Sequence, residues 1–102
     1  MNDDWPFDQP PNCAVITLRS IVFDGAPILH VTHDLDDHGW QFLGLADADE
    51  DDAAVVCLSE IVQRDSSVFQ LADMAPGWHA WRLNTASPWR RARNAKSGAK
   101  TG

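Results

Sequence analysis

Residues 30–42, HVTHDLDDHGWQF, place a short polar segment between two runs of strand-forming residues. On one side Val31 alternates with its neighbours along an extended run, and on the other Trp40 and Phe42 share one face of a strand. Between the two runs, several aspartates followed by a glycine are typical of a turn. The segment therefore predicts two strands joined by a polar connection.

The flanking sequence predicts further strands. Residues 13–18, CAVITL, are rich in β-branched side chains, which favour strands. Asp24 and Gly25 separate the apolar runs SIVF and APILHV, and such a dipeptide is the usual composition of a tight hairpin turn. Residues 78–83, WHAWRL, alternate between the two faces of an extended chain and predict a closing strand.

Between residues 53 and 74 the spacing of apolar residues becomes that of a helix. Leu58, Ile61 and Val62 fall three and four residues apart, and Asp65 precedes a second short apolar pattern, VFQLADM. Amphipathic helices of this kind bury one face against a sheet. The sequence thus predicts a small α+β domain, with an antiparallel sheet of about five strands and two short helices packed on one face.

The folded part is expected to be a single domain over residues 12–91. Residues 1–11 contain three prolines, and residues 92–102 are basic and have no apolar pattern, so both segments are expected to be disordered. A domain of about 80 residues buries a marginal core unless a partner or a second copy covers part of its surface.

Charge divides the chain into an acidic body and a basic end. The formal net charge is -7, every acidic residue lies at or before Asp73, and six basic residues follow from Arg82 onward. An acidic body repels a phosphate backbone, which argues against nucleic-acid binding by the folded part. No apolar run is long enough to cross a membrane. Cys13 and Cys57 lie in apolar runs and are expected to be buried thiols, so the protein is expected to be cytoplasmic.

The polar connection resembles a calcium loop only in part. Asp34, Asp36 and His38 occupy the first, third and fifth positions, with Gly39 at the sixth. Such a loop needs Asp or Asn at the fifth position and a glutamate at the twelfth, where this chain has Leu45. We therefore predict no calcium site here.

A zinc site or a catalytic dyad is the alternative interpretation of the same segment. His30 and His33 are three residues apart, so on a strand they point to opposite faces and cannot chelate one ion. A metal-dependent protein or small enzyme could instead use the turn residues, namely His33, Asp34, Asp36 and His38. The chain has no nucleophile motif and no glycine-rich phosphate loop, and we predict neither catalysis, a metal nor a cofactor.

Five tryptophans are many for so small a core, and tryptophan is enriched at the centres of protein interfaces. We expect the two acidic segments, 34–37 and 47–52, to face a partner protein with a basic surface, or a second copy to bind nearby. The candidate interaction residues are Asp34, Asp36, Asp37, Asp49, Asp51 and Trp78.

GAPILHVTHDLDDHGWQF, followed by an acidic loop, LSEIVQRDSSVFQL and PGWHAWR, resembles a bacterial family of small domains of unknown function. Some relatives of that family look like immunity proteins of polymorphic toxin systems. The resemblance covers about residues 12–91, and its motifs are residues that shape the fold. It implies a non-catalytic cytoplasmic α+β module that acts through protein contacts, in an immunity-like role.

Overall fold

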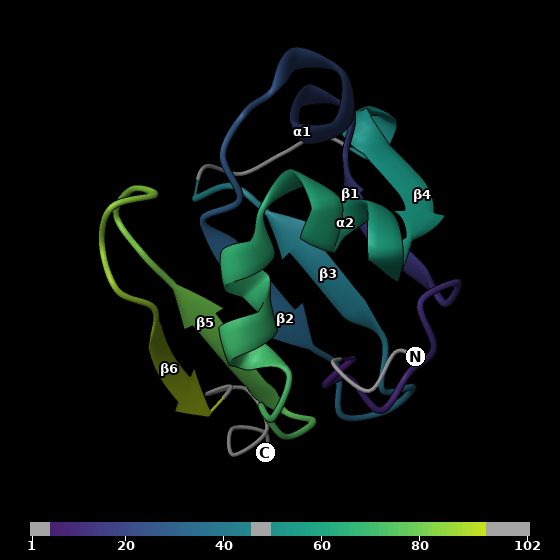
Figure 1. Ribbon diagram of the computed structural model, residues 1–102, viewed down its shortest axis with the longest axis vertical. Coiled ribbons are helices and arrows are strands. Elements are labelled where there is room, and N and C mark those ends of the chain that lie inside the picture. Colours follow the sequence, from purple (N-terminus) through teal and green to yellow (C-terminus); the bar gives the residue numbers. More distant parts are fainter. Residues whose placement is uncertain (1–4, 46–49, 94–102) are drawn as a thin grey trace.

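The computed structural model describes residues 5–45 and 50–93. These residues form one six-stranded sheet with two α-helices, α1 and α2, and two short 3₁₀ helices, η1 and η2 (Figure 1). In chain order the elements are β1 (Ala14–Leu18), α1 (Arg19–Asp24), β2 (His30–His33), β3 (Trp40–Leu43), η1 (Glu50–Asp52), β4 (Ala53–Cys57), α2 (Leu58–Arg64), η2 (Ser66–Leu71), β5 (Trp78–Trp81) and β6 (Arg90–Arg93).

The sheet runs in the order β4-β1-β3-β2-β5-β6, and α2 and η2 lie across one of its faces (Figure 1). All described neighbours are antiparallel except β1 and β3, which are parallel. The α+β class is therefore confirmed. The expectation of a purely antiparallel sheet with about five strands is wrong, because the sheet is mixed and has six.

The predicted hairpin at Asp24 and Gly25 is a helix end instead. Residues 19–24 form α1, and Gly25 caps it with a φ of 76°, the left-handed conformation that glycine adopts most readily. The same dipeptide composition serves a hairpin turn or a helix terminus. Because α1 replaces the expected second strand, β2 is not next to β1 in the sheet. β3 lies between them and pairs with both.

The sequence patterns did not indicate two of the strands. β4, with the sequence AAVVC, lies directly before α2 and pairs with β1 over its whole length. β6, with the sequence RRAR, has almost no apolar character and pairs with β5 through the backbone. Its last residues, Ala92 and Arg93, extend the folded part past the expected boundary at residue 91. The remaining residues of the expected basic tail lie outside the described ones.

The core fills the space between the sheet and the pair α2 and η2. Strand residues alternate, so each strand sends every second side chain into this layer. The faces predicted for β3 and β5 are confirmed, since Trp40 and Phe42 point into the core together and Trp78 lies on the face opposite Trp81. The largest fully buried side chains are Trp40, Phe42, Ile28, Leu58, Ile61, Leu71, Val15, Val31, Val68 and Thr17.

The N-terminal segment closes one end of this core. The Phe7 side chain is 5% exposed and its ring centroid lies 5.3 Å from that of Trp40. The indole N–H of Trp40 donates to Gln9 Oε1 at 3.1 Å, and the indole N–H of Trp5 donates to the Gln9 carbonyl at 2.6 Å. The expectation of disorder over residues 1–11 is therefore corrected for residues 5–11, because isolated aromatics suffice to anchor a short segment. Residues 1–4 lie outside the described ones.

We expect Phe7→Ala to lower the free energy of unfolding by about 3 kcal/mol, because it empties a buried aromatic site. The matched control is Phe23→Ala, since Phe23 is 76% exposed at the end of α1. That variant should change the stability by less than about 0.5 kcal/mol. Urea unfolding followed by tryptophan fluorescence measures both, and equal effects of the two variants would contradict the anchoring of this segment.

A buried guanidinium connects the covering layer to the sheet. Arg82, 3% exposed, donates to the Ile28 carbonyl from Nε at 3.1 Å and from Nη2 at 2.9 Å. It also donates to Ser67 Oγ at 2.9 Å, forms an ion pair with Asp65, and lies 4.2 Å from the Trp89 ring centroid. One side chain thus holds the start of η2, the segment before β2 and the segment before β6.

The pKa of the Asp65 carboxyl reflects this network. Burial raises the pKa of Asp65, but hydrogen bonds from the Ser67 hydroxyl, from Arg82 and from the Ser67 backbone, together with the charge of Arg82, outweigh burial and lower it. A carboxyl whose pKa is lowered by folding stabilises the folded state above its ordinary pKa, and that stabilisation is lost as the pH falls through the folded-state value.

We expect Arg82→Met to cost about 3 kcal/mol, because it removes the guanidinium from Asp65 Oδ2 and from the buried Ile28 carbonyl. Arg64→Met is the control, since Arg64 is exposed and lies 4.0 Å from Glu60, and it should cost less than about 0.5 kcal/mol. Denaturation measured from about pH 7 down to about pH 3 should show less loss of stability in Arg82→Met than in the parent protein. An unchanged pH profile would exclude a contribution of the ion pair.

Candidate binding surface on the open face of the sheet

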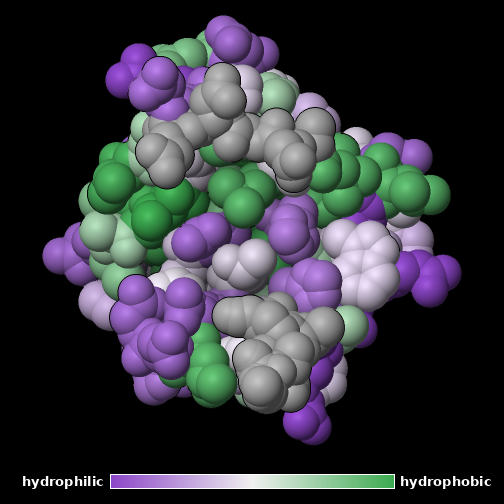
Figure 2. Space-filling view, turned by 180° about the vertical axis from the view of Figure 1, so that it is seen from behind, coloured by the Kyte–Doolittle hydropathy of each residue, from purple (hydrophilic) through white to green (hydrophobic). Residues whose placement is uncertain are grey.

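The sheet face opposite α2 and η2, here called the open face, carries no helix among the described residues. The strand register aligns one row of side chains across all six strands of this face. This row is apolar at β4 and β1 and polar at β3, β2 and β5. On the surface of the same face, hydrophobic residues gather on the β4 side and hydrophilic residues lie towards the middle (Figure 2). In order the row is Val55, Ile16, Gln41, Thr32, His79 and Ala92.

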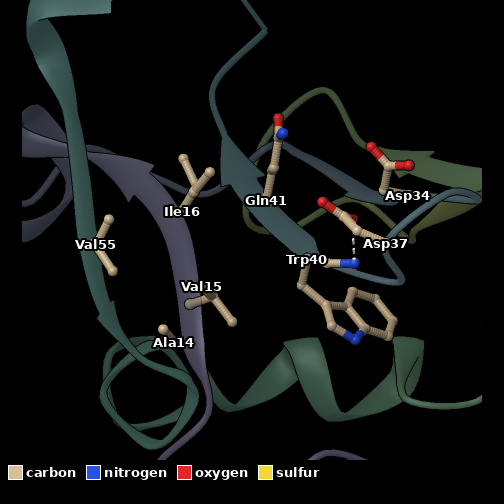
Figure 3. A pocket seen from close by; sticks show the side chains of 9 residues that line it. Ala14, Val15, Ile16, Asp34, Asp37, Trp40, Gln41 and Val55 are labelled. Atoms are coloured by element: carbon tan, nitrogen blue, oxygen red, sulfur yellow. Dashed lines mark hydrogen bonds between the residues drawn. The ribbon is translucent and has the colours of Figure 1, made fainter.

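A pocket of about 300 Å³ lies at the apolar end of this face. Ile16, Gln41 and Val55 stand side by side from neighbouring strands, and the carboxylates of Asp34 and Asp37 lie at one end (Figure 3). Val55 is 69% exposed and Ile16 is 40% exposed. The pocket therefore combines accessible apolar side chains with two negative charges.

Small residues leave the space for this pocket. Ala14, the first residue of β1, and Gly39, just before β3, line it and contribute almost no side-chain volume there. A Cβ atom at Gly39 would lie 3.0 Å from Asp37 Oδ1, tighter than most such contacts, so the Asp37 carboxylate would have to shift. Glycine at this position thus makes room both for the pocket and for the carboxylate beside it.

The turn between β2 and β3 fixes its own carboxylates. The Asp36 backbone N–H donates to Asp34 Oδ1 at 2.7 Å, and the Gly39 backbone N–H donates to Asp37 Oδ1 at 2.8 Å. His38 has a φ of 60°, and the Asp34 N–H closes the turn by donating to the Gly39 carbonyl at 2.8 Å. These are the local bonds by which aspartates stabilise turns, and they require no cation.

His33, the last residue of β2, and His38, in the turn that follows, face a second hollow on the covered side of the sheet. His33 and His38 line this space of about 450 Å³ together with the N-terminal segment and the connection from η2 to β5. Their ring centroids are 6.3 Å apart. His33 is stacked on Trp40 at 3.9 Å, and its Nδ1 lies 2.8 Å from the Met74 carbonyl. Because a carbonyl only accepts, Nδ1 carries the proton and donates.

The residues of the alternative metal or catalytic site are therefore separated. His33 and His38 share one hollow, Asp34 lines the pocket on the opposite face, and Asp36 is exposed at the tip of the turn. In the described part of the chain, no three histidine, cysteine or acidic side chains are placed to hold a metal ion.

The other candidate interaction residues are spread over the molecule. Asp51 is exposed in η1, whereas Trp78 is half-buried on the covered face of β5, an interior strand of the sheet. Asp49 lies outside the described residues.

The expectation of two buried thiols is wrong for Cys57. Its side chain is exposed, because β4 directs it to the open face. Cys13 is half-buried, and both thiols are free.

A histidine pair at the polar end of the open face was not apparent from the sequence. His30 Nε2 lies 3.1 Å from His79 Nδ1, and the two rings meet edge to face. Burial, and secondarily the nearby His79, lower the pKa of His30. The pair depends on the register between β2 and β5, in which Thr32 faces His79, and that register cannot be read from the isolated segments.

No family model, curated protein or solved structure matches this chain. No helix in the described ranges is both long and apolar enough to span a membrane.

We expect neither zinc nor calcium to bind the turn stoichiometrically at micromolar affinity at physiological ionic strength. The turn carboxylates are held by backbone donors, and the histidines face the other side. Calorimetric titration tests this expectation. A one-to-one transition that is lost in both His33→Ala and Asp36→Ala would contradict the observed separation and support a metal-dependent function.

Proposed function

We propose that this chain is a non-catalytic protein-binding domain that recognises a basic segment of a partner protein on its open face. The observation that carries this proposal is a pocket lined at one end by exposed Ile16 and Val55 and at the other by the carboxylates of Asp34 and Asp37 (Figure 3). A lysine or arginine side chain has both an apolar stem and a cationic head, and such a pocket offers a contact for each.

The local geometry favours binding without reorganisation. Asp34 and Asp37 already accept one backbone hydrogen bond each, and the strands on either side of their turn, β2 and β3, are paired. Less conformational freedom is lost on binding when the groups are held in place beforehand. The net charge of -7 adds long-range attraction for a basic partner, which raises its association rate.

An immunity-like role in the bacterial cytoplasm is the more specific form of this proposal. Toxin nucleases present basic surfaces to nucleic acid, and an acidic surface with an apolar centre is suited to covering one. Support comes from the charge of the body and from the accessible face. Co-production with a toxin encoded by a neighbouring gene should then restore growth, and pocket variants should not.

The direct test uses a short extended peptide with two lysines flanking a leucine, titrated into isotopically labelled protein and followed by NMR. We expect methyl shifts at Ile16 and Val55. Asp34→Asn with Asp37→Asn keeps the side-chain acceptors of the turn but removes two charges, and should weaken binding about five- to tenfold, as expected for two partly exposed ion pairs.

The control for this titration is Asp8→Asn with Asp24→Asn, which removes the same charge from exposed positions away from the pocket. It should reduce the affinity by less than about twofold, since distant exposed charges are screened by salt. Equal weakening by both double variants would reduce the interaction to net charge. Shifts confined to the covered side of the sheet would contradict the proposed face.

A further inference from the structure

The two outer strands of the sheet differ in charge. β4 and β6 are the end strands, so each has one edge without a neighbouring strand among the described residues. β6 carries Arg90, Arg91 and Arg93, whereas β4 has the uncharged sequence AAVVC. Charged residues on an edge strand are a common protection against pairing with another chain, and a neutral apolar edge lacks that protection.

The hydrogen-bonding groups of the β4 edge can be assigned from its pairing with β1. The Leu58 N–H donates to the Cys13 carbonyl at 2.8 Å, just beyond the facing pair Ala14 and Cys57. Hydrogen-bonded and non-hydrogen-bonded pairs alternate along an antiparallel ladder. The residues opposite Ala14, Ile16 and Leu18 therefore direct their N–H and C=O groups outward, and these are Cys57, Val55 and Ala53.

We propose that two copies of this chain associate by antiparallel pairing of their β4 strands, with Val55 on the two-fold axis. When the pairing is centred on Val55, residues whose N–H and C=O groups point outward face one another across the two copies. Val55 then faces Val55, and Ala53 faces Cys57. Each such pair exchanges backbone hydrogen bonds, and both sheets join into one.

Side-chain charge favours this pairing over the alternatives. Across the β4 axis only neutral side chains face one another, whereas pairing of two β6 edges would bring arginines into opposition, which is destabilising. On the open face, the exposed Val55 side chains of the two copies would meet, with Ile16 behind each. The apolar ends of the two rows thus become one continuous strip.

The proposed interface is small, and the acidic residues around it repel those of the second copy. Pairing of two such short strands buries less than the roughly 1,200 Å² of a typical stable complex, so a weak dimer is expected. Asp51 and Asp52 directly precede β4 and approach the second copy near its Glu60. Salt screens this repulsion, so association should strengthen with ionic strength. Binding of a basic partner should weaken with salt, which makes the two interactions distinguishable.

Sedimentation equilibrium over a wide concentration range tests the association. The parent protein should be monomeric when dilute and dimeric at high micromolar concentration, more so at high salt. Val55→Lys places a charge on the axis and should raise the dissociation constant by about tenfold or more, since like charges directly opposite one another destabilise strand pairing. Leu83→Lys is the matched control, because Leu83 is exposed outside β4, and it should leave the constant unchanged.

Disulfide cross-linking tests the register in a Cys13→Ser, Cys57→Ser background. With Val55→Cys added, the two thiols face each other with Cα atoms about 5.5 Å apart, a separation that a disulfide spans, so oxidation should give a covalent dimer. With Ala53→Cys added instead, each new thiol faces position 57 of the other copy, where the background substitution has removed the thiol, and little dimer should form. A strict monomer at all concentrations, loss of the dimer in Leu83→Lys, or equal cross-linking of both variants would overturn the proposal.

Discussion

The buried guanidinium of Arg82 is the interaction on which the arrangement of the layers depends. A charge that is only 3% exposed would be strongly destabilising without partners, and here its donors meet a carboxylate, a hydroxyl and a carbonyl. These partners come from separate segments of the chain. The guanidinium therefore has all of its hydrogen-bond acceptors only when η2 lies over the sheet and the Ile28 carbonyl, just before β2, lies next to it. Displacing any of these segments would leave a buried polar group without its partner, so this one side chain couples their positions.

Sequence periodicity predicted the elements whose apolar residues alternate against a buried layer. β3 and β5 place Trp40, Phe42, Trp78 and Trp81 on the faces expected of them, and α2 was located by Leu58, Ile61 and Val62. The same reasoning failed for β6, because a strand made of arginines is specified by backbone pairing with β5 and by contacts such as that of Arg91 with Asp73.

The candidate site could be predicted only by its residue types. The polar turn was identified as a feature, and Asp34 does line the pocket, but sequence distance did not reveal that the carboxylates and the histidines of one turn lie on opposite sides of the sheet. The separation has two causes. Successive strand side chains point to opposite faces of the sheet, and backbone N–H groups of the turn hold the carboxylates of Asp34 and Asp37. The pocket itself also depends on Ala14, which only the parallel pairing of β1 and β3 brings beside Gly39.

The parallel pair at the centre of the sheet has a consequence for how the chain acquires this fold. β2 and β3 are close in sequence and can pair early, whereas β1 must be brought back across α1 and the whole β2–β3 hairpin before it pairs with β3. Closing such a loop costs chain entropy before any contact repays it, so non-local pairings form slowly. The buried hydroxyl of Thr17, which donates to the Phe42 carbonyl at 2.7 Å, finds its acceptor only at that step. Since β4 is bound to the sheet through β1 alone, the part of the open face that β4 and β1 form joins the β2–β3 hairpin through this one parallel pair.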